Sequence, residues 1–222
     1  MIATAANMQF AVKELVKEFV LETGINSQTV ISSSGKLTAQ IKEGAPFHVF
    51  LSANMKYPNE LYQDELTIDT PRIYTYGQLV LWTTQKDIEP NINQLNQTKI
   101  KHIALANPKT APYGEAAIQV LRHYNLIEKL EKKLVYGESI AQTNQFITTQ
   151  AAEIGFTSKS VVLAPKIKNQ GKWIDIPASL HQPIEQGIVI IKNENADQVK
   201  KAQEFQDFLF SEKGQAILKQ FY

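Results

Sequence analysis

The sequence contains no cysteine, which excludes thiol catalysis, disulfide bonds and thiolate metal sites. It also lacks an excess of charge of one sign, because 23 Lys and Arg residues face 22 Asp and Glu residues and the formal net charge is +1. No overall field would attract a nucleic acid or an anionic membrane surface, so we expect no nucleic-acid partner. No apolar run reaches the length of a membrane-spanning helix. A binding site for a charged ligand would therefore have to be local.

Motifs for catalysis and for direct metal binding are missing as well. The four histidines, His48, His102, His123 and His181, stand at no recognised ligand spacing. The tripeptide Ser-Gly-Lys at 34–36 resembles the end of a P-loop, but the first glycine of that motif is absent and leucine follows the lysine. No G-x-S-x-G elbow and no acid–base pair of carboxylates stands out. We therefore predict a non-enzyme with no catalytic residue, no protein-bound metal and no cofactor.

The order of the predicted elements indicates the fold class. The chain has 222 residues, enough for one large or two modest domains, and 43% of them are hydrophobic. Apolar strands alternate with segments of helical periodicity, which predicts an α/β fold with two lobes, each a mostly parallel sheet flanked by helices. Two β-rich crossings, near 74–82 and 185–190, divide the chain into a discontinuous lobe 1 (1–78 plus 188–222) and lobe 2 (79–187). We expect these crossings to form the hinge.

The stretch 30–44, VISSSGKLTAQIKEG, carries the first binding signal. An apolar strand end runs into three serines and Gly35, and Leu37, Ile41 and Ala45 then recur four residues apart, as on one face of a helix. Serine is a preferred N-cap, and a helix N-terminus offers N–H groups and a positive dipole end to an anion. Taken alone, the stretch is more typical of an ordinary strand-to-helix turn capped by serine than of a binding site.

Three further strand-to-helix junctions strengthen that signal. Asn7 follows a short strand and stands at the N-cap of a helix predicted from Met8, where its amide could also donate to a ligand. Pro112 suits a first helical turn, so the N–H groups of Tyr113 and Gly114 would point outward. The fourth junction is Ser139-Ile140. Ligands of open α/β sheets bind at the carboxyl ends of strands, so facing lobes would hold a dianion between four helix ends without lysine or arginine.

These stretches resemble the periplasmic molybdate-binding proteins of ABC transporters, over essentially the full chain. The matching segments are Ala5-Ala6-Asn7, SSSGKLTAQIKEGAPFHVFLSAN (32–54), NPKTAPYGEAA (107–117), AEIGFTSKS (152–160) and FLFSEKGQAILKQFY (208–222). The resemblance implies a type II periplasmic-binding fold, with two lobes that are joined by crossing strands and close on tetrahedral molybdate or tungstate. The serine-turn segment is its most specific part.

The resemblance also implies a set of ligand-binding positions. These are the donor residue Asn7, the hydroxyl of Ser34 and the backbone N–H groups of Tyr113 and Ile140. The residues expected to surround and support these positions are Ser33, Gly35, Pro112, Gly114, Ser139 and Thr157. The chain departs from many members at His48, where they have Asp, and at Thr157, where they place a tyrosine hydroxyl on the oxyanion.

The function implied is that of a receptor for a molybdate and tungstate importer. We expect a monomer in the periplasm, with its signal peptide removed from this chain, that delivers its oxyanion to a membrane permease. A pocket of donors alone should bind little hydrogen phosphate, whose proton needs an acceptor. The alternatives are a cytoplasmic oxyanion-sensing regulatory domain, a receptor for another oxyanion such as sulfate, and an enzyme acting on a phosphorylated or sulfated metabolite.

Overall fold

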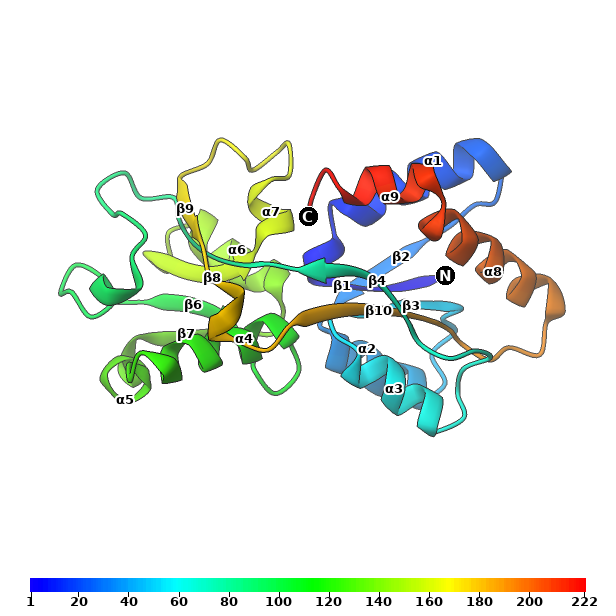
Figure 1. The fold of residues 1–222 in the computed structure, drawn as a ribbon, viewed down its shortest axis with the longest axis horizontal. Coiled ribbons are helices and arrows are strands. Elements are labelled where there is room, and N and C mark those ends of the chain that lie inside the picture. Colours follow the sequence, from blue (N-terminus) through cyan, green and yellow to red (C-terminus); the bar gives the residue numbers. More distant parts are fainter. The chain divides into compact units, whose positions relative to one another are not determined.

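A computed structural model describes residues 1–222, which divide into two compact units. Unit 1 comprises Met1–Tyr76 and Glu185–Tyr222, and unit 2 comprises Gly77–Ile184. The chain passes between the units within β4 (Arg72–Gly77) and β10 (Ile184–Ile190), which can be followed in Figure 1. The predicted two-lobed α/β fold is confirmed. None of the helices combines the length and the apolar composition that crossing a bilayer requires.

The sheet of unit 1 has the strand order β2-β1-β3-β10-β4. Its remaining strands are β1 (Ile2–Ala5), β2 (Thr29–Ser32) and β3 (Val49–Leu51). β1 runs parallel to both β2 and β3, whereas β10 is antiparallel to β3. All four residues of β1 are buried, as expected for a strand covered on both faces.

Helices cover both faces of this sheet (Figure 1). They are α1 (Ala11–Thr23), α2 (Ser34–Lys42), α3 (Lys56–Gln63), α8 (Ala196–Phe210) and α9 (Glu212–Leu218). On the α2 and α3 side, Leu37 and Leu61 pack in one cluster with Phe50 of β3. On the other side, the Phe19 ring meets the Phe205 ring edge-on, with 5.3 Å between centroids. These fully buried aromatic and aliphatic side chains form the core of the unit.

The start of the first helix differs from the prediction. The helix expected from Met8 begins at Ala11, and the 3-10 turn η1 (Ala6–Met8) precedes it, so Asn7 lies inside a turn and is not its N-cap. Met8 is fully buried one helical turn before Ala11. A buried residue at that spacing fits either a continuous helix or a separate tight turn, so periodicity could not distinguish them.

Unit 2 contains a mixed sheet with the order β7-β6-β8-β5-β9. β6 is parallel to β7 and β8, and β5 is antiparallel to β8 and β9. The strands are β5 (Leu79–Thr83), β6 (Ile103–Ala106), β7 (Leu134–Gly137), β8 (Ile154–Ser158) and β9 (Lys172–Asp175). The helices and 3-10 turns are α4 (Pro112–His123), α5 (Ile127–Leu130), α6 (Ile140–Thr148), α7 (Lys159–Val162), η2 (Ile92–Gln94), η3 (Glu131–Lys133) and η4 (Ala178–Leu180).

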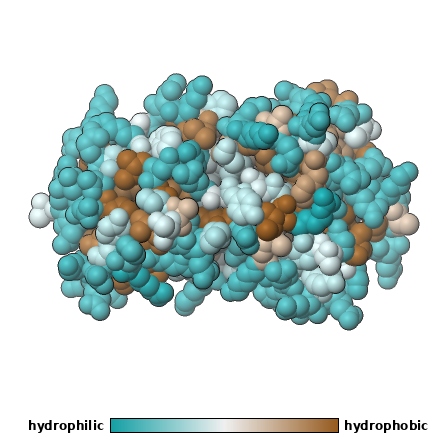
Figure 2. All heavy atoms as spheres, in the orientation of Figure 1, coloured by the Kyte–Doolittle hydropathy of each residue, from teal (hydrophilic) through white to brown (hydrophobic).

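Buried apolar side chains also hold unit 2 together. Trp82 of β5 is fully buried and clusters with Ala104 of β6 and Ile147 of α6. On the face drawn in Figure 2, hydrophilic side chains predominate over both units and apolar ones lie in small groups. The hydrophobic residues of the chain are thus used mainly inside the two units.

Candidate functional site

The four predicted junctions lie in two pairs, each at the carboxyl edge of one sheet. In unit 1, Ala5 of β1 is opposite Ser32 of β2 in a parallel pair, so the chain leaves adjacent strands at Ala6 and Ser33. In unit 2, Ala106 of β6 is opposite Gly137 of β7 in the same way. Because carboxyl ends of parallel strands meet at one sheet edge, each unit brings two candidate junctions together.

Ser34 is the first residue of α2 and is buried. Its Oγ accepts a hydrogen bond from the backbone N–H of Ala53 at 3.0 Å. Ala53 follows β3, which lies on the other side of β1 from β2, so this bond ties α2 to a third strand end. A hydroxyl oxygen that accepts from an amide still has its own proton to donate. Ser34 therefore keeps a hydroxyl proton that it can donate.

Ser33 stands at the N-cap position in extended conformation, but its hydroxyl makes no capping bond. The expected serine cap is therefore absent. Ser33 is only 3% exposed, and its Oγ is buried without a hydrogen-bond partner. The first N–H groups of α2, at Ser34 and Gly35, have no acceptor within the helix. Donor groups that a serine cap would have satisfied are thus left at this helix end.

Asn7 is 1% exposed and its carboxamide bonds within unit 1. Nδ2 donates to Gln186 Oε1 at 2.8 Å and to the Tyr222 hydroxyl at 3.1 Å. Both amide hydrogens are thereby used. The prediction that the Asn7 amide could donate to a ligand would require it to exchange one of these bonds, so the side chain serves first to hold the η1 turn in place.

The α4 junction in unit 2 places Pro112 in the first helical turn, as predicted. Tyr113 follows it with its ring buried, and its hydroxyl accepts from Ser158 Oγ at 2.9 Å. The N–H of Gly114 donates to the carbonyl of Ala111 at 2.9 Å, so the expected outward-pointing N–H at Gly114 is wrong. The close approach of α4 to β6 explains why residue 114 is glycine, because a Cβ there would lie 2.0 Å from the Ala106 carbonyl oxygen.

The α6 junction begins with Ser139 as N-cap in extended conformation, and its side chain makes no capping bond. Its carbonyl accepts from both the N–H and the hydroxyl of Thr143, at 3.0 Å each. Ile140 is the buried first residue of the helix, and its N–H has no acceptor within the helix. This N–H is suitably located for an anion at the end of β7.

Thr157 lies in the middle of the sheet of unit 2 and is fully buried. Its hydroxyl donates to Asn144 Oδ1 at 2.6 Å, so it links β8 to α6. Asn144 is 5% exposed and its Nδ2 has no partner. Sequence reasoning missed Asn144. The signal was a polar residue four positions after Ile140, on the face of α6 that carries buried residues.

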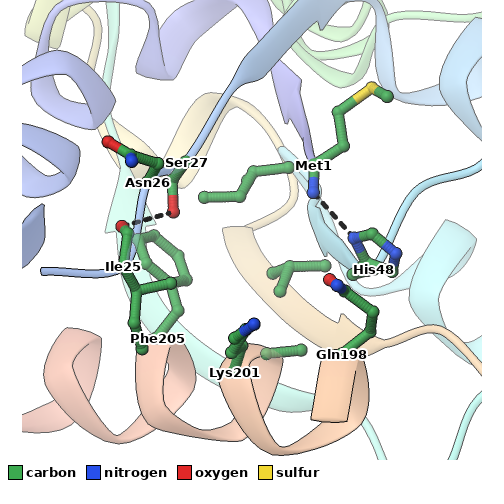
Figure 3. A pocket seen from close by; sticks show the side chains of 11 residues that line it. Met1, Ile25, Asn26, Ser27, His48, Gln198, Lys201 and Phe205 are labelled. Carbon is green, nitrogen blue, oxygen red and sulfur yellow. Dashed lines mark hydrogen bonds between the residues drawn. The ribbon is translucent and has the colours of Figure 1, made fainter. Parts of the chain in front are cut away.

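His48, the other departure from the resemblance, lies at the opposite end of β1 from Asn7. Its Nδ1 is 2.7 Å from the Met1 amine nitrogen, and its N–H donates to the Met1 carbonyl. Figure 3 shows the two groups in a pocket of about 40 Å³, with Lys201 and Gln198 on its α8 side. Burial, and secondly the positive amine, lower the pKa of His48. His48 therefore does not belong to the junctions.

The side chains of Gln186, Tyr222, Asn144 and Ser158, which form hydrogen bonds with candidate residues, are uncharged amides and hydroxyls. The structure contains no group of three or more histidine, aspartate or glutamate side chains that could hold a metal ion. The two sheet edges therefore offer N–H and O–H donors, the chemistry that suits a fully deprotonated oxyanion.

Comparison with known proteins identifies a family over the whole chain. The profile "Bacterial extracellular solute-binding protein" matches residues 1–222. The molybdate-binding protein ModA of Azotobacter vinelandii is 36% identical over 220 residues, which are 98% of this chain and 86% of that protein. ModA of Rhodobacter capsulatus is 34% identical over 220 residues, covering 99% of this chain and 85% of that protein.

Solved structures give the same result for the fold. The Azotobacter vinelandii periplasmic molybdate-binding protein has a TM-score of 0.90 and 31% identity, over 99% of this chain and 96% of that one. The sulfate-binding protein SubI from Mycobacterium tuberculosis has a TM-score of 0.80 over 99% of this chain and 83% of that one, but is only 10% identical. That second likeness concerns the fold alone.

Proposed function

The chain belongs to the bacterial extracellular solute-binding proteins, and we propose that it is the receptor of an ABC importer for molybdate and tungstate. The observation that carries the proposal is the bond from Ala53 N–H to the buried Ser34 Oγ, in which the hydroxyl oxygen is the acceptor and its proton is left to donate elsewhere. The two molybdate-binding relatives at 36% and 34% identity support the choice of ligand.

In this proposal, the ligand is held by neutral groups from both units. From unit 1, Ser34 donates its hydroxyl proton. Asn7 donates its side-chain amide after exchanging one of its two present hydrogen bonds. The backbone N–H groups of Tyr113 and Ile140 donate from unit 2. Each helix N-terminus stabilises an anion by about 0.3–1 kcal/mol at an exposed site and by up to about 2 kcal/mol when partly buried. Several of them would hold a dianion without a basic side chain.

Donors alone also select the protonation state of the ligand. Molybdate, tungstate and sulfate need only donors when they are fully deprotonated, whereas hydrogen phosphate presents an O–H that requires an acceptor. A buried O–H without an acceptor costs about 1–3 kcal/mol. Phosphate should therefore bind about 5- to 150-fold more weakly than an anion of similar size that carries no proton.

The same proposal covers partner and location. A solute-binding receptor in the periplasm would close its two units about β4 and β10 when the oxyanion binds, and the closed form would dock on a membrane permease. We expect a monomer that carries no cofactor and performs no catalysis. A cytoplasmic oxyanion sensor and a sulfate receptor are the alternatives that the measurements below distinguish.

The first test is isothermal titration with molybdate, tungstate, sulfate and phosphate. We expect tight binding of the first two, weaker sulfate binding and little phosphate binding. A ligand at about 100 times its Kd should also stabilise the fold by about 2.7 kcal/mol and raise the melting temperature. Sulfate binding tighter than molybdate binding would replace the proposal with a sulfate receptor. No binding of any of the four would overturn it.

The second test addresses closure. Small-angle scattering with and without molybdate should show a smaller radius of gyration in the bound state, because closure of two units compacts the molecule. Titration against proteoliposomes that contain the cognate permease would then separate a transport receptor from a cytoplasmic sensor.

A further inference from the structure

A buried amide on β10 joins Asn7 to both strands along which the chain crosses between units. Three donors lie within hydrogen-bond distance of Gln186 Oε1. The Asn7 amide is 2.8 Å away, the Tyr74 hydroxyl is 3.0 Å away and the Tyr222 hydroxyl is 3.4 Å away. Gln186 is 0% exposed, Asn7 is 1% exposed and Tyr74 is 4% exposed. One buried neutral acceptor therefore lies within hydrogen-bond distance of three donor groups.

The same group of side chains spans distant parts of the sequence. Asn7 and Gln186 are 179 residues apart, and Tyr74 and Gln186 are 112 residues apart. The single proton of the Tyr74 hydroxyl is shared between Gln186 and the carbonyl of Ser52, which is 3.3 Å away, and the Tyr222 hydroxyl contacts Met8 Sδ at 3.0 Å. The network thus connects the η1 turn, the end of β3 and the C-terminal residue.

The network lies next to both boundaries between the two units of the chain. Tyr74 lies in β4 two residues before the boundary at Tyr76, and Gln186 lies in β10 one residue after the boundary at Glu185. These two strands carry the chain from one unit to the other. The η1 turn of Asn7 is also one of the two oxyanion junctions of unit 1. Any shift of β4 or β10 that moved Gln186 would also change the hydrogen bond that holds the Asn7 side chain.

We infer that Gln186 is a positioning residue of the oxyanion site, which sets the orientation of the Asn7 turn and couples it to both crossing strands. The inference rests on the proposed function. The residue type fits the role, because a glutamine supplies an acceptor for three donors without placing a negative charge close to a bound dianion. A glutamate would keep the acceptor and add that charge.

The first experiment compares Gln186→Met with a matched control, Gln206→Met. Gln206 is also a buried glutamine of unit 1 and is 6% exposed. Its Nε2 donates to Asp69 Oδ2 at 3.1 Å and not to Asn7. Both variants lose a buried amide, so both should melt at a lower temperature. Only Gln186→Met should raise the Kd for molybdate, by about tenfold or more, while Gln206→Met stays within about twofold of wild type.

A second variant keeps the inference testable if Gln186→Met does not fold. Gln186→Glu retains an acceptor of the same shape, and burial raises the pKa of such a carboxyl group. The ratio of its molybdate Kd to the wild-type Kd, measured at each pH, should fall as pH decreases, because protonation restores a neutral side chain. A variant that is merely destabilised would show a lower melting temperature and a pH-independent ratio.

A third variant tests the link to the crossing strand. Tyr74→Phe removes a donor to Gln186 and leaves the Asn7 bonds in place, so it should weaken molybdate binding by a smaller factor than Gln186→Met. Unchanged binding in Gln186→Met together with a pH-independent Gln186→Glu ratio would overturn the inference and leave the proposed function intact. Failure of the wild type to bind molybdate would instead overturn the proposed function.

Discussion

The backbone N–H of Ala53 and the hydroxyl oxygen of Ser34 are 3.0 Å apart and join two turns that are 19 residues apart in the chain. The hydroxyl oxygen is the acceptor in this bond, so the serine proton is left to donate elsewhere. Ser34→Ala removes that proton and leaves the buried Ala53 N–H without an acceptor, which should cost about 1–3 kcal/mol of stability and raise the molybdate Kd about tenfold or more. Titration calorimetry and thermal melting measure the two effects.

The neighbouring serine is the matched control. Ser33 Oγ is buried without a partner, so Ser33→Ala removes an unsatisfied polar atom and should leave the ligand-free melting temperature unchanged or raised. Equal losses of molybdate affinity in the two alanine variants would contradict the special role of Ser34.

Gly114→Ala should disrupt unit 2. The added Cβ would meet the Ala106 carbonyl oxygen at 2.0 Å, which is backbone and can move only if α4 shifts away from β6. Overpacking of this kind typically costs about 1–3 kcal/mol. Glu115→Ala, an exposed change one residue later in the same helix, is the control and should alter the melting temperature little. A wild-type melting curve for Gly114→Ala would show that the contact is loose.

His48 should make the stability depend on pH. Burial lowers its pKa below the ordinary value of 6.5, and the Met1 amine lowers it further. The unfolded chain then binds the proton at a higher pH than the folded protein, so stability should fall as pH decreases below about 6.5. His48→Gln should flatten the melting-temperature profile between pH about 7 and about 5. The exposed His123→Gln serves as control, and an unchanged profile in His48→Gln would assign the pH dependence to other groups.

The Thr157 and Asn144 pair should show strong coupling. Thr157→Val removes the 2.6 Å bond and leaves the buried Asn144 amide with no partner at either end, which should destabilise unit 2 by about 1–3 kcal/mol. Adding Asn144→Leu removes the stranded amide and should recover part of the loss. Denaturant unfolding of both single variants and the double variant gives the coupling energy. Additive losses of unfolding free energy would show that the two residues are not coupled.

Local sequence was sufficient for the αβ alternation and for the positions of the four strand-to-helix junctions, because first-turn proline and apolar spacing act within a few residues. Pro112 and the buried face of α1 illustrate this. The same local signals were insufficient at Asn7, where a 3-10 turn replaces the expected cap, and at Gly114, whose N–H is already bonded to Ala111.

What the sequence by itself determined is the class of the protein and the places where its strands release donor groups, since these depend on neighbours along the chain. The tertiary structure alone decided which groups remain to donate. Ser34 and Ala53, Asn7 and Gln186, and Thr157 and Asn144 come together only when helices, turns and strands that are 13 to 179 residues apart pack against one another. Hydrogen bonds act over about 3 Å in space, so no pattern of spacing in the chain contains them.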